Sequence, residues 1–272
     1  TDGVDNDADF VADCDDEDCF GETGYTTELN CTDGADNDLD TLVDCDDTVD
    51  CGSTPECSPY VAFFEFFEID PDSFDLEGRS ITFTPDAVDP RLYTFALTSG
   101  TTAYPVTPGT GTTTTTLPLT TSTNRAVTFV NLPSFTFFGE AYTTVHVGSG
   151  GHVNFGTGYT GSVDSMSEFF GRPTVAVLGE YLNPSSGTVT VDDFADRVVV
   201  TWNDVPFSGE PELNQFQLIL NSTGTIEMHY VAVPEGGPDG SDSIVVGITD
   251  GVGISPYPDE VEAFRRTLRN AG

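Results

Sequence analysis

Residues 216–230 read Phe216-Gln217-Leu218-Ile219-Leu220-Asn221-Ser222-Thr223-Gly224-Thr225-Ile226-Glu227-Met228-His229-Tyr230. In both halves of this stretch, apolar side chains occupy every second position, which is the period of a strand with one buried face. Folding the halves around Ser222-Thr223-Gly224 pairs Leu220 with Ile226, Leu218 with Met228 and Phe216 with Tyr230, all on one face. The loop ends in glycine, where a three-residue hairpin needs a left-handed residue. The stretch therefore predicts an antiparallel hairpin.

A second stretch has the same combination of pattern and turn. Val147 pairs with Val153, and Val145 with Phe155, around Ser149-Gly150-Gly151. Short β-branched and aromatic runs recur throughout residues 59–256, separated by Gly, Pro, Asn and Asp, and helical periodicity is almost absent. We expect an all-β fold there, a jelly-roll-like β-sandwich. The expected strands are Tyr60–Ile69, Ser80–Thr84, Leu92–Thr98, Ala126–Leu132, Tyr142–Val147, His152–Phe155, Thr174–Leu178, Thr188–Val191, Arg197–Trp202, Gln215–Asn221, Thr225–Val231 and Ser243–Thr249.

The charge balance excludes several classes of partner. The 272 residues include 46 acidic and 8 basic ones, which gives a formal net charge of −38, and every basic residue is arginine. Nucleic acid is excluded as a partner, because phosphate binding needs clustered Lys and Arg, and anionic membrane surfaces are disfavoured. No apolar run reaches the ~18 residues of a membrane span, so no transmembrane segment is predicted.

Residues 1–57 differ in composition from the rest of the chain. They hold 20 of the acidic residues, none of the basic ones and all six cysteines. An even number of cysteines in a short acidic segment predicts disulfides, and hence an extracellular location. Many pairings are open, and we favour Cys19–Cys31, Cys51–Cys57 and Cys14–Cys45.

The same segment contains a repeat with the spacing of a calcium loop. Thr1–Asp9 recurs as Thr32–Asp40, and residues 11–16 recur as 42–47. Carboxylates at positions 1, 3, 5, 9 and 12 of a loop, with a backbone carbonyl at position 7, can wrap around one Ca²⁺ ion. We expect irregular, disulfide-linked calcium-binding loops over residues 1–58. The predicted ligands are Asp5, Asp7, Asp9, the Val11 carbonyl, Asp13 and Asp16 in the first copy, and Asp36, Asp38, Asp40, the Leu42 carbonyl, Asp44 and Asp47 in the second.

No helical pattern flanks these loops, so they are not EF-hands. They resemble the thrombospondin type 3 calcium repeat, and more closely the Cys-containing Asp-Gly-x-Asp-Asn-Asp repeats of bacterial extracellular proteins. Position 6 of such loops is usually glycine, but Phe10 and Thr41 stand there in this chain. A bulky or β-branched residue resists the positive φ of a sharp turn. We therefore expect this departure to affect the calcium affinity of the loops, or the geometry of the coordination.

A second resemblance covers roughly residues 126–253. Its motifs are similar to the nidogen-like extracellular domain of many bacterial secreted proteins. The resemblance implies a β-sandwich with an adhesive or architectural role and without catalysis. The motifs are Phe137-Phe138-Gly139-x-x-Tyr142, Val145-x-Val147-x-Ser149-Gly150-Gly151-x-Val153-x-Phe155-Gly156, Arg172-Pro173, Arg197-Val198-Val199-Val200-Thr201-Trp202, Phe216-Gln217-Leu218 and Gly224-Thr225-Ile226.

No arrangement typical of catalysis stands out. His146, His152 and His229 are each out of phase with the apolar residues of their hairpins, so we expect them on solvent-facing strand positions. Neither a Gly-x-Ser-x-Gly elbow nor a His-Glu-x-x-His helix occurs. Trp202 alternates with valines, and we expect it in the core rather than as a platform for sugar stacking. The sequence predicts a protein that is not an enzyme.

Residues 107–123 contain ten threonines. Two interpretations are open: a plain Thr-rich strand or loop, which we favour, and an O-glycosylated surface segment. Asn221-Ser222-Thr223 and Asn30-Cys31-Thr32 are triplets for N-glycosylation.

Residues 257–272 carry the one convincing helical pattern. Asp259 can cap the helix, and Arg265, Arg266 and Arg269 give it a basic end in an acidic chain. We expect a secreted, calcium-binding structural subunit of a bacterial cell-surface filament or surface layer that associates head to tail. Two interpretations of the tail itself are open: its arginines complement the helix dipole while it packs on its own sandwich, which we favour, or it docks on the acidic start of the next copy. The alternative is a monomeric adhesive or carbohydrate-binding module, with glycans as partners.

Overall fold

The computed structural model describes residues 41–42, 50, 62–67, 74–233 and 244–251. The chain divides into two compact units, Thr1–Pro59 and Tyr60–Gly272. Every strand described below belongs to the second unit. In the described ranges, no helix is long and apolar enough to cross a membrane.

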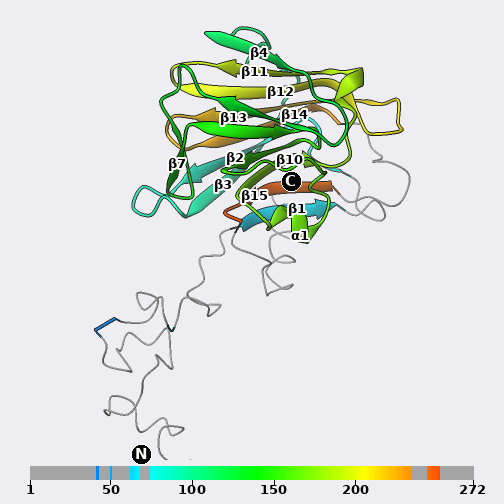
Figure 1. The fold of residues 1–272 in the computed structure, drawn as a ribbon. Coiled ribbons are helices and arrows are strands. Elements are labelled where there is room, and N and C mark those ends of the chain that lie inside the picture. Colours follow the sequence, from blue (N-terminus) through cyan, green and yellow to red (C-terminus); the bar gives the residue numbers. More distant parts are fainter. Residues whose placement is uncertain (1–40, 43–49, 51–61, 68–73, 234–243, 252–272) are drawn as a thin grey trace, which may run out of the picture. The chain divides into compact units, whose positions relative to one another are not determined.

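Two antiparallel sheets pack into a sandwich (Figure 1). The larger sheet has seven strands in the order β3-β2-β14-β13-β12-β11-β4, so β3 and β4 form its two edges. Its strands are β2 (Arg79–Pro85), β3 (Tyr93–Ser99), β4 (Thr113–Leu117), β11 (Thr188–Asp193), β12 (Arg197–Pro206), β13 (Leu213–Asn221) and β14 (Ile226–Ala232).

The smaller sheet has six strands in the order β1-β15-β10-β9-β8-β5. Its strands are β1 (Ala62–Phe67), β5 (Asn124–Thr128), β8 (Thr144–Gly148), β9 (His152–Phe155), β10 (Thr174–Gly179) and β15 (Ile244–Thr249). The remaining elements are the ribbon of β6 (Phe135–Phe137) and β7 (Glu140–Tyr142), the helix α1 (Met166–Phe169) and the 3-10 turn η4 (Pro184–Ser186). The predicted all-β sandwich is confirmed.

Both predicted hairpins form in the predicted register. Leu220 pairs with Ile226, Leu218 with Met228 and Phe216 with Tyr230, and Gly224 takes a φ of 84°. Val147 pairs with Val153 and Val145 with Phe155, and Gly151 takes a φ of 65°. Pattern and turn chemistry together fix the register, because a slip by one residue would turn every apolar side chain to the other face.

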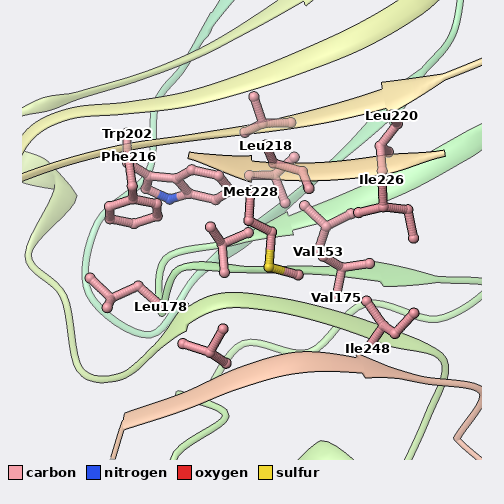
Figure 2. Close-up of a cluster of buried hydrophobic side chains, with 14 of the residues drawn as sticks. Val153, Val175, Leu178, Trp202, Phe216, Leu218, Leu220, Ile226, Met228 and Ile248 are labelled. Atoms are coloured by element: carbon pink, nitrogen blue, oxygen red, sulfur yellow. The ribbon is translucent and has the colours of Figure 1, made fainter. Parts of the chain in front are cut away.

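The core lies between the two sheets, where their apolar faces meet (Figure 2). Trp202 and Phe216, on adjacent strands, stack with ring centroids 4.9 Å apart and an interplanar angle of 16°. Val153, Val175 and Ile248 contribute from the six-stranded sheet. Trp202 is fully buried, which confirms its predicted place in the core.

The six-stranded sheet is buried on its outer face as well. Phe64, Phe169, Phe170, Val163, Ala176 and Val245 form a second apolar cluster there. Phe64 lies 5.3 Å from Phe170 and 5.6 Å from Phe169, measured between ring centroids. The segment around α1 therefore covers this face, and β10 and β15 are buried along their whole lengths.

Several elements differ from the sequence prediction. Strand β5 ends at Thr128, before the predicted Leu132, because residues 130–132 turn to donate backbone hydrogen bonds to Asp193. The Thr-rich segment contains strand β4, which is absent from the predicted strands. The strand predicted over Tyr60–Ile69 is present as β1, at an edge of the six-stranded sheet. The β6–β7 ribbon and α1 were not predicted, because each is too short to show a period.

Candidate functional site

The predicted calcium ligands lie almost wholly outside the described residues. The predicted C-terminal helix and residues 1–40 also lie outside them. Of the predicted ligands only Leu42 is described, and this residue is 37% exposed. The predicted ligands outside the described residues are Asp5, Asp7, Asp9, Val11, Asp13, Asp16, Asp36, Asp38, Asp40, Asp44 and Asp47. The six cysteines predicted to form disulfides also lie outside them: Cys14, Cys19, Cys31, Cys45, Cys51 and Cys57.

One backbone feature of the second loop is described. Thr41, at position 6, has a φ of 85°. This is the left-handed region in which glycine is favoured and β-branched residues are rare. Thr41 therefore adopts the backbone conformation that glycine usually supplies at position 6 of such loops.

Within the sandwich, backbone atoms pack closely against the hairpin turn at Ser149-Gly150-Gly151. The Gly151 carbonyl accepts hydrogen bonds from the amides of Val177 and Leu178, at 3.0 Å each. A Cβ at Gly151 would lie 2.2 Å from the Leu178 carbonyl oxygen, and one at Gly150 would lie 2.9 Å from the Ser162 Cα. Only glycines let β10 and residue 162 approach this turn so closely.

His152 follows this turn and lies beneath the covering segment. The prediction that it faces solvent is wrong: His152 is fully buried. Its alternation with Val153 is as predicted, but the outer face of this sheet is covered, so both sides of β9 are buried. Burial lowers the pKa of His152 to about 4, although the Gly150 carbonyl, 3.3 Å from Nδ1, acts in the other direction.

A polar network joins the covering segment to β9. The Tyr159 hydroxyl donates to Glu168 Oε1 at 2.6 Å, and the Ser165 hydroxyl donates to Glu168 Oε2 at 2.6 Å. The Arg172 guanidinium lies 4.3 Å from the centroid of the Tyr159 ring. The Tyr159 amide in turn donates to Asn154 Oδ1 at 3.1 Å. Helix α1 and the loop before it are thus tied to buried polar side chains of the sheet.

Within this network the pKa values of two carboxyl groups are shifted in opposite directions. Burial raises the pKa of Asp164. Burial would also raise the pKa of Glu168, but hydrogen bonds from Ser165 and Tyr159 outweigh it, so that this pKa is lowered. The hydrogen bond to Glu168 and burial raise the pKa of Tyr159 to about 12. Each of these groups is engaged by a neighbour, so the network joins helix α1 and the loop before it to the sheet.

Two adjacent aspartates on β11 anchor loops on opposite sides of the seven-stranded sheet. Asp192 is fully buried and accepts hydrogen bonds from the amides of Gly109 and Gly111 and from the Thr114 hydroxyl, at 2.9, 2.8 and 2.5 Å. Asp193 accepts from the amides of residues 130, 131 and 132. No sequence motif marked these residues. Among the described residues, no three His, Cys, Asp or Glu side chains lie close enough to hold a metal ion.

The comparison with known families agrees with this architecture. The family model described as NIDO related matches residues 92–266. The chain belongs to this nidogen-related family. No curated protein and no solved structure matches the chain. The predicted nidogen-like module is confirmed, and with it an extracellular domain; the thrombospondin-like character of the first unit and a bacterial source stay predictions.

A groove lined by described residues lies at one hairpin end of the nidogen-related domain. Its volume is about 420 Å³, and it lies beside the turn of the β13–β14 hairpin. The polar lining consists of hydroxyls and one carboxylate, and the apolar lining of two prolines and an alanine. The lining residues are Thr84, Pro85, Asp86, Ala87, Pro90, Thr136, Ser222, Thr223, Gly224 and Thr225.

The buried His152 makes the nidogen-related domain sensitive to acid. The unfolded chain binds a proton at His152 near pH 6.5, whereas the folded domain binds it only near pH 4. Stability is therefore full above pH 6.5 and falls as the pH drops toward 4, by about 3 kcal/mol. Urea unfolding at a series of pH values should show this loss in the native protein and not in His152→Gln, while the two curves run parallel above pH 7. If the free energy of unfolding fell equally steeply in both proteins between pH 6.5 and 4, the loss of stability would not come from His152.

Proposed function

We propose that the protein is a non-catalytic, calcium-binding structural protein of an extracellular assembly, a filament or surface layer. The observation that carries the proposal is the duplicated loop, in which five carboxylates recur in phase in two copies. The positive φ of Thr41 supports it, because this is the backbone conformation that glycine usually supplies at position 6 of a calcium loop. Membership of the nidogen-related family supports the extracellular setting.

Calcium binding is expected to supply the folding free energy of the first 57 residues. This segment holds 20 carboxyl groups and no basic residue, and it has few large apolar side chains to bury. Bound cations would remove the repulsion between these carboxylates, so the binding energy becomes folding energy.

Titration calorimetry of the metal-free full chain tests this. We expect calcium binding that weakens at least tenfold in a double variant with one ligand lost from each loop, Asp7→Asn with Asp38→Asn. The matched control is Asp75→Asn, an exposed aspartate of the other unit. A chelator should leave the fluorescence of Trp202, the only tryptophan, unchanged. No heat of binding at millimolar calcium would refute calcium binding.

Self-association is proposed to run head to tail. The last eight residues carry three of the eight basic residues and no acidic one, whereas residues 1–57 hold 20 acidic residues and no basic one. Opposite charges at the two ends favour a heterologous contact, which repeats without closing. Deletion of residues 259–272 should abolish assembly seen by electron microscopy at fixed calcium and salt. Assembly equal to that of the intact chain would show that the tail is not the connector.

A monomeric adhesive or carbohydrate-binding module is the second candidate. The hydroxyl-lined groove favours it, since hydroxyls both donate to and accept from a neutral sugar, and the proline rings offer apolar contact. The groove contains no aromatic platform, and the one tryptophan is buried. Binding of an oligosaccharide by a chain that stays monomeric in calcium would favour this candidate.

A further inference from the structure

The edge strands of the two sheets of the nidogen-related domain differ in the residues that protect them from pairing with another strand. Natural sheets protect edge strands with charged residues, prolines, bulges or charges that point inward, because an open edge offers unpaired N–H and C=O groups to another strand. The edges of the six-stranded sheet follow this rule. Strand β5 carries the exposed Arg125, and β1 carries Glu65, which is 2% exposed.

The edges of the seven-stranded sheet have none of these devices. Residues 92–124 contain no charged residue, although the chain as a whole has a net charge of −38. This uncharged stretch includes both edge strands, β3 and β4. Neither strand contains proline, and the ladders that join them to β2 and β11 run without a register shift. In the described part of the chain, no strand pairs with the outer side of either one.

The side chains of both edges are suited to further pairing. On β4, Thr113–Thr116 are all exposed, and threonine has a high propensity for strands. On β3, Leu97 packs against the core but is only partly buried. A strand added beside β3 would complete its burial.

The occupant that fits these edges is a second copy of the chain. Two copies with this net charge repel each other over most of their surfaces, and the repulsion is least where the uncharged stretch is presented. Figure 1 shows β4 at the outermost position of the seven-stranded sheet, with β3 at its other side. We propose that β4 of one copy pairs with β3 of the next, so that the seven-stranded sheets join into one continuous sheet.

The strand directions define this contact further. Six antiparallel pairings separate β3 from β4, so the two edge strands run in the same direction. Copies that present the same sheet face therefore join through a parallel pair. The contact uses different surfaces on the two copies, and such contacts repeat without closing. The inference rests on the proposed self-assembly and adds a contact independent of residues 1–58 and 257–272.

The test uses the full chain in calcium and two variants that place a lysine on the core side of an edge. Thr115→Lys lies in the middle of β4, and Leu97→Lys lies in β3; pairing would bury each ammonium group. The matched control is Val127→Lys, a partly buried apolar residue on edge strand β5 of the other sheet. Unfolding followed by Trp202 fluorescence checks that all variants are folded.

Sedimentation and electron microscopy should show at least tenfold less assembly for each edge variant alone and native assembly for the control. An equimolar mixture of the two edge variants should form dimers, because each retains the edge that the other lacks. Native-like assembly of both variants would overturn the edge contact and leave the proposed self-assembly standing. If Leu97→Lys alone still dimerises, the contact is β4 to β4. A monomeric chain with sugars attached to the β4 threonines would also overturn the edge contact. If the intact chain never assembles, both the edge contact and the proposed self-assembly are wrong.

Discussion

Replacing Gly151 by alanine is expected to destabilise the nidogen-related domain by about 3 kcal/mol or more, since strain at positive φ adds to a clash with backbone. The new Cβ would lie 2.2 Å from the Leu178 carbonyl oxygen, where no flexible side chain can move aside. Relief requires β10 to shift, and that would stretch the two hydrogen bonds that the Gly151 carbonyl accepts.

Gly209→Ala is the matched control. Gly209 also has a positive φ, 95°, but no atom lies within 4 Å of the place where its Cβ would be. Its substitution should cost only the backbone strain, about 1 kcal/mol. Urea unfolding followed by the fluorescence of Trp202 measures both variants. Equal losses for the two would mean that the approach of β10 to the turn is not what requires glycine at position 151.

The local pattern of the sequence was sufficient to predict the hairpins. Phe216, Leu218 and Leu220 alternate over a short distance, and the glycine at the end of each loop limits the register to one choice. Trp202 was placed correctly for the same reason. Such predictions depend only on residues close together in the chain.

Whether the outer face of a sheet is buried or exposed to solvent could not be predicted from the local pattern. Alternation shows that His152 and Val153 point to opposite sides, but not that Tyr159 and α1 cover one of those sides. Both faces of this antiparallel sheet are covered, whereas a sheet with one solvated face is a common arrangement. The error at His152 therefore concerns tertiary packing and not the strand itself.

The contacts by which Asp192 and Asp193 anchor two loops were not predicted either, because their partners are also distant in the sequence. In a chain with 46 acidic residues, a further Asp-Asp pair carries no signal of its own. The partners of Asp192 lie 78 to 83 positions earlier in the chain, and two of them are backbone amides of glycines. Glycines 109 and 111 in the Thr-rich segment were the only trace of this contact in the sequence, and they are equally typical of any loop.

Asp192→Ala is expected to destabilise the nidogen-related domain by about 3–5 kcal/mol, because two buried amides and one hydroxyl lose a charged acceptor together. The anchored loop also contacts the sheet elsewhere: Gln217 donates to the Val106 carbonyl at 2.8 Å, and the Tyr104 hydroxyl donates to Asn203 Oδ1 at 3.1 Å. Loss of the Asp192 anchor should therefore loosen the whole segment across the sheet, and not only the Gly109–Gly111 turn.

Two further variants separate the causes. Asp192→Asn keeps one acceptor oxygen without the charge and should cost less than the alanine. Asp196→Ala removes an exposed aspartate whose ion pair with Arg197, at 3.3 Å, lies in solvent, so its effect should stay within about 0.5 kcal/mol. Hydrogen exchange gives a local readout: the amides of Gly109 and Gly111 should exchange faster in Asp192→Ala and at the native rate in Asp196→Ala. A loss below about 1 kcal/mol, with both amides still protected, would mean that Gln217 and Tyr104 hold the segment without the carboxylate.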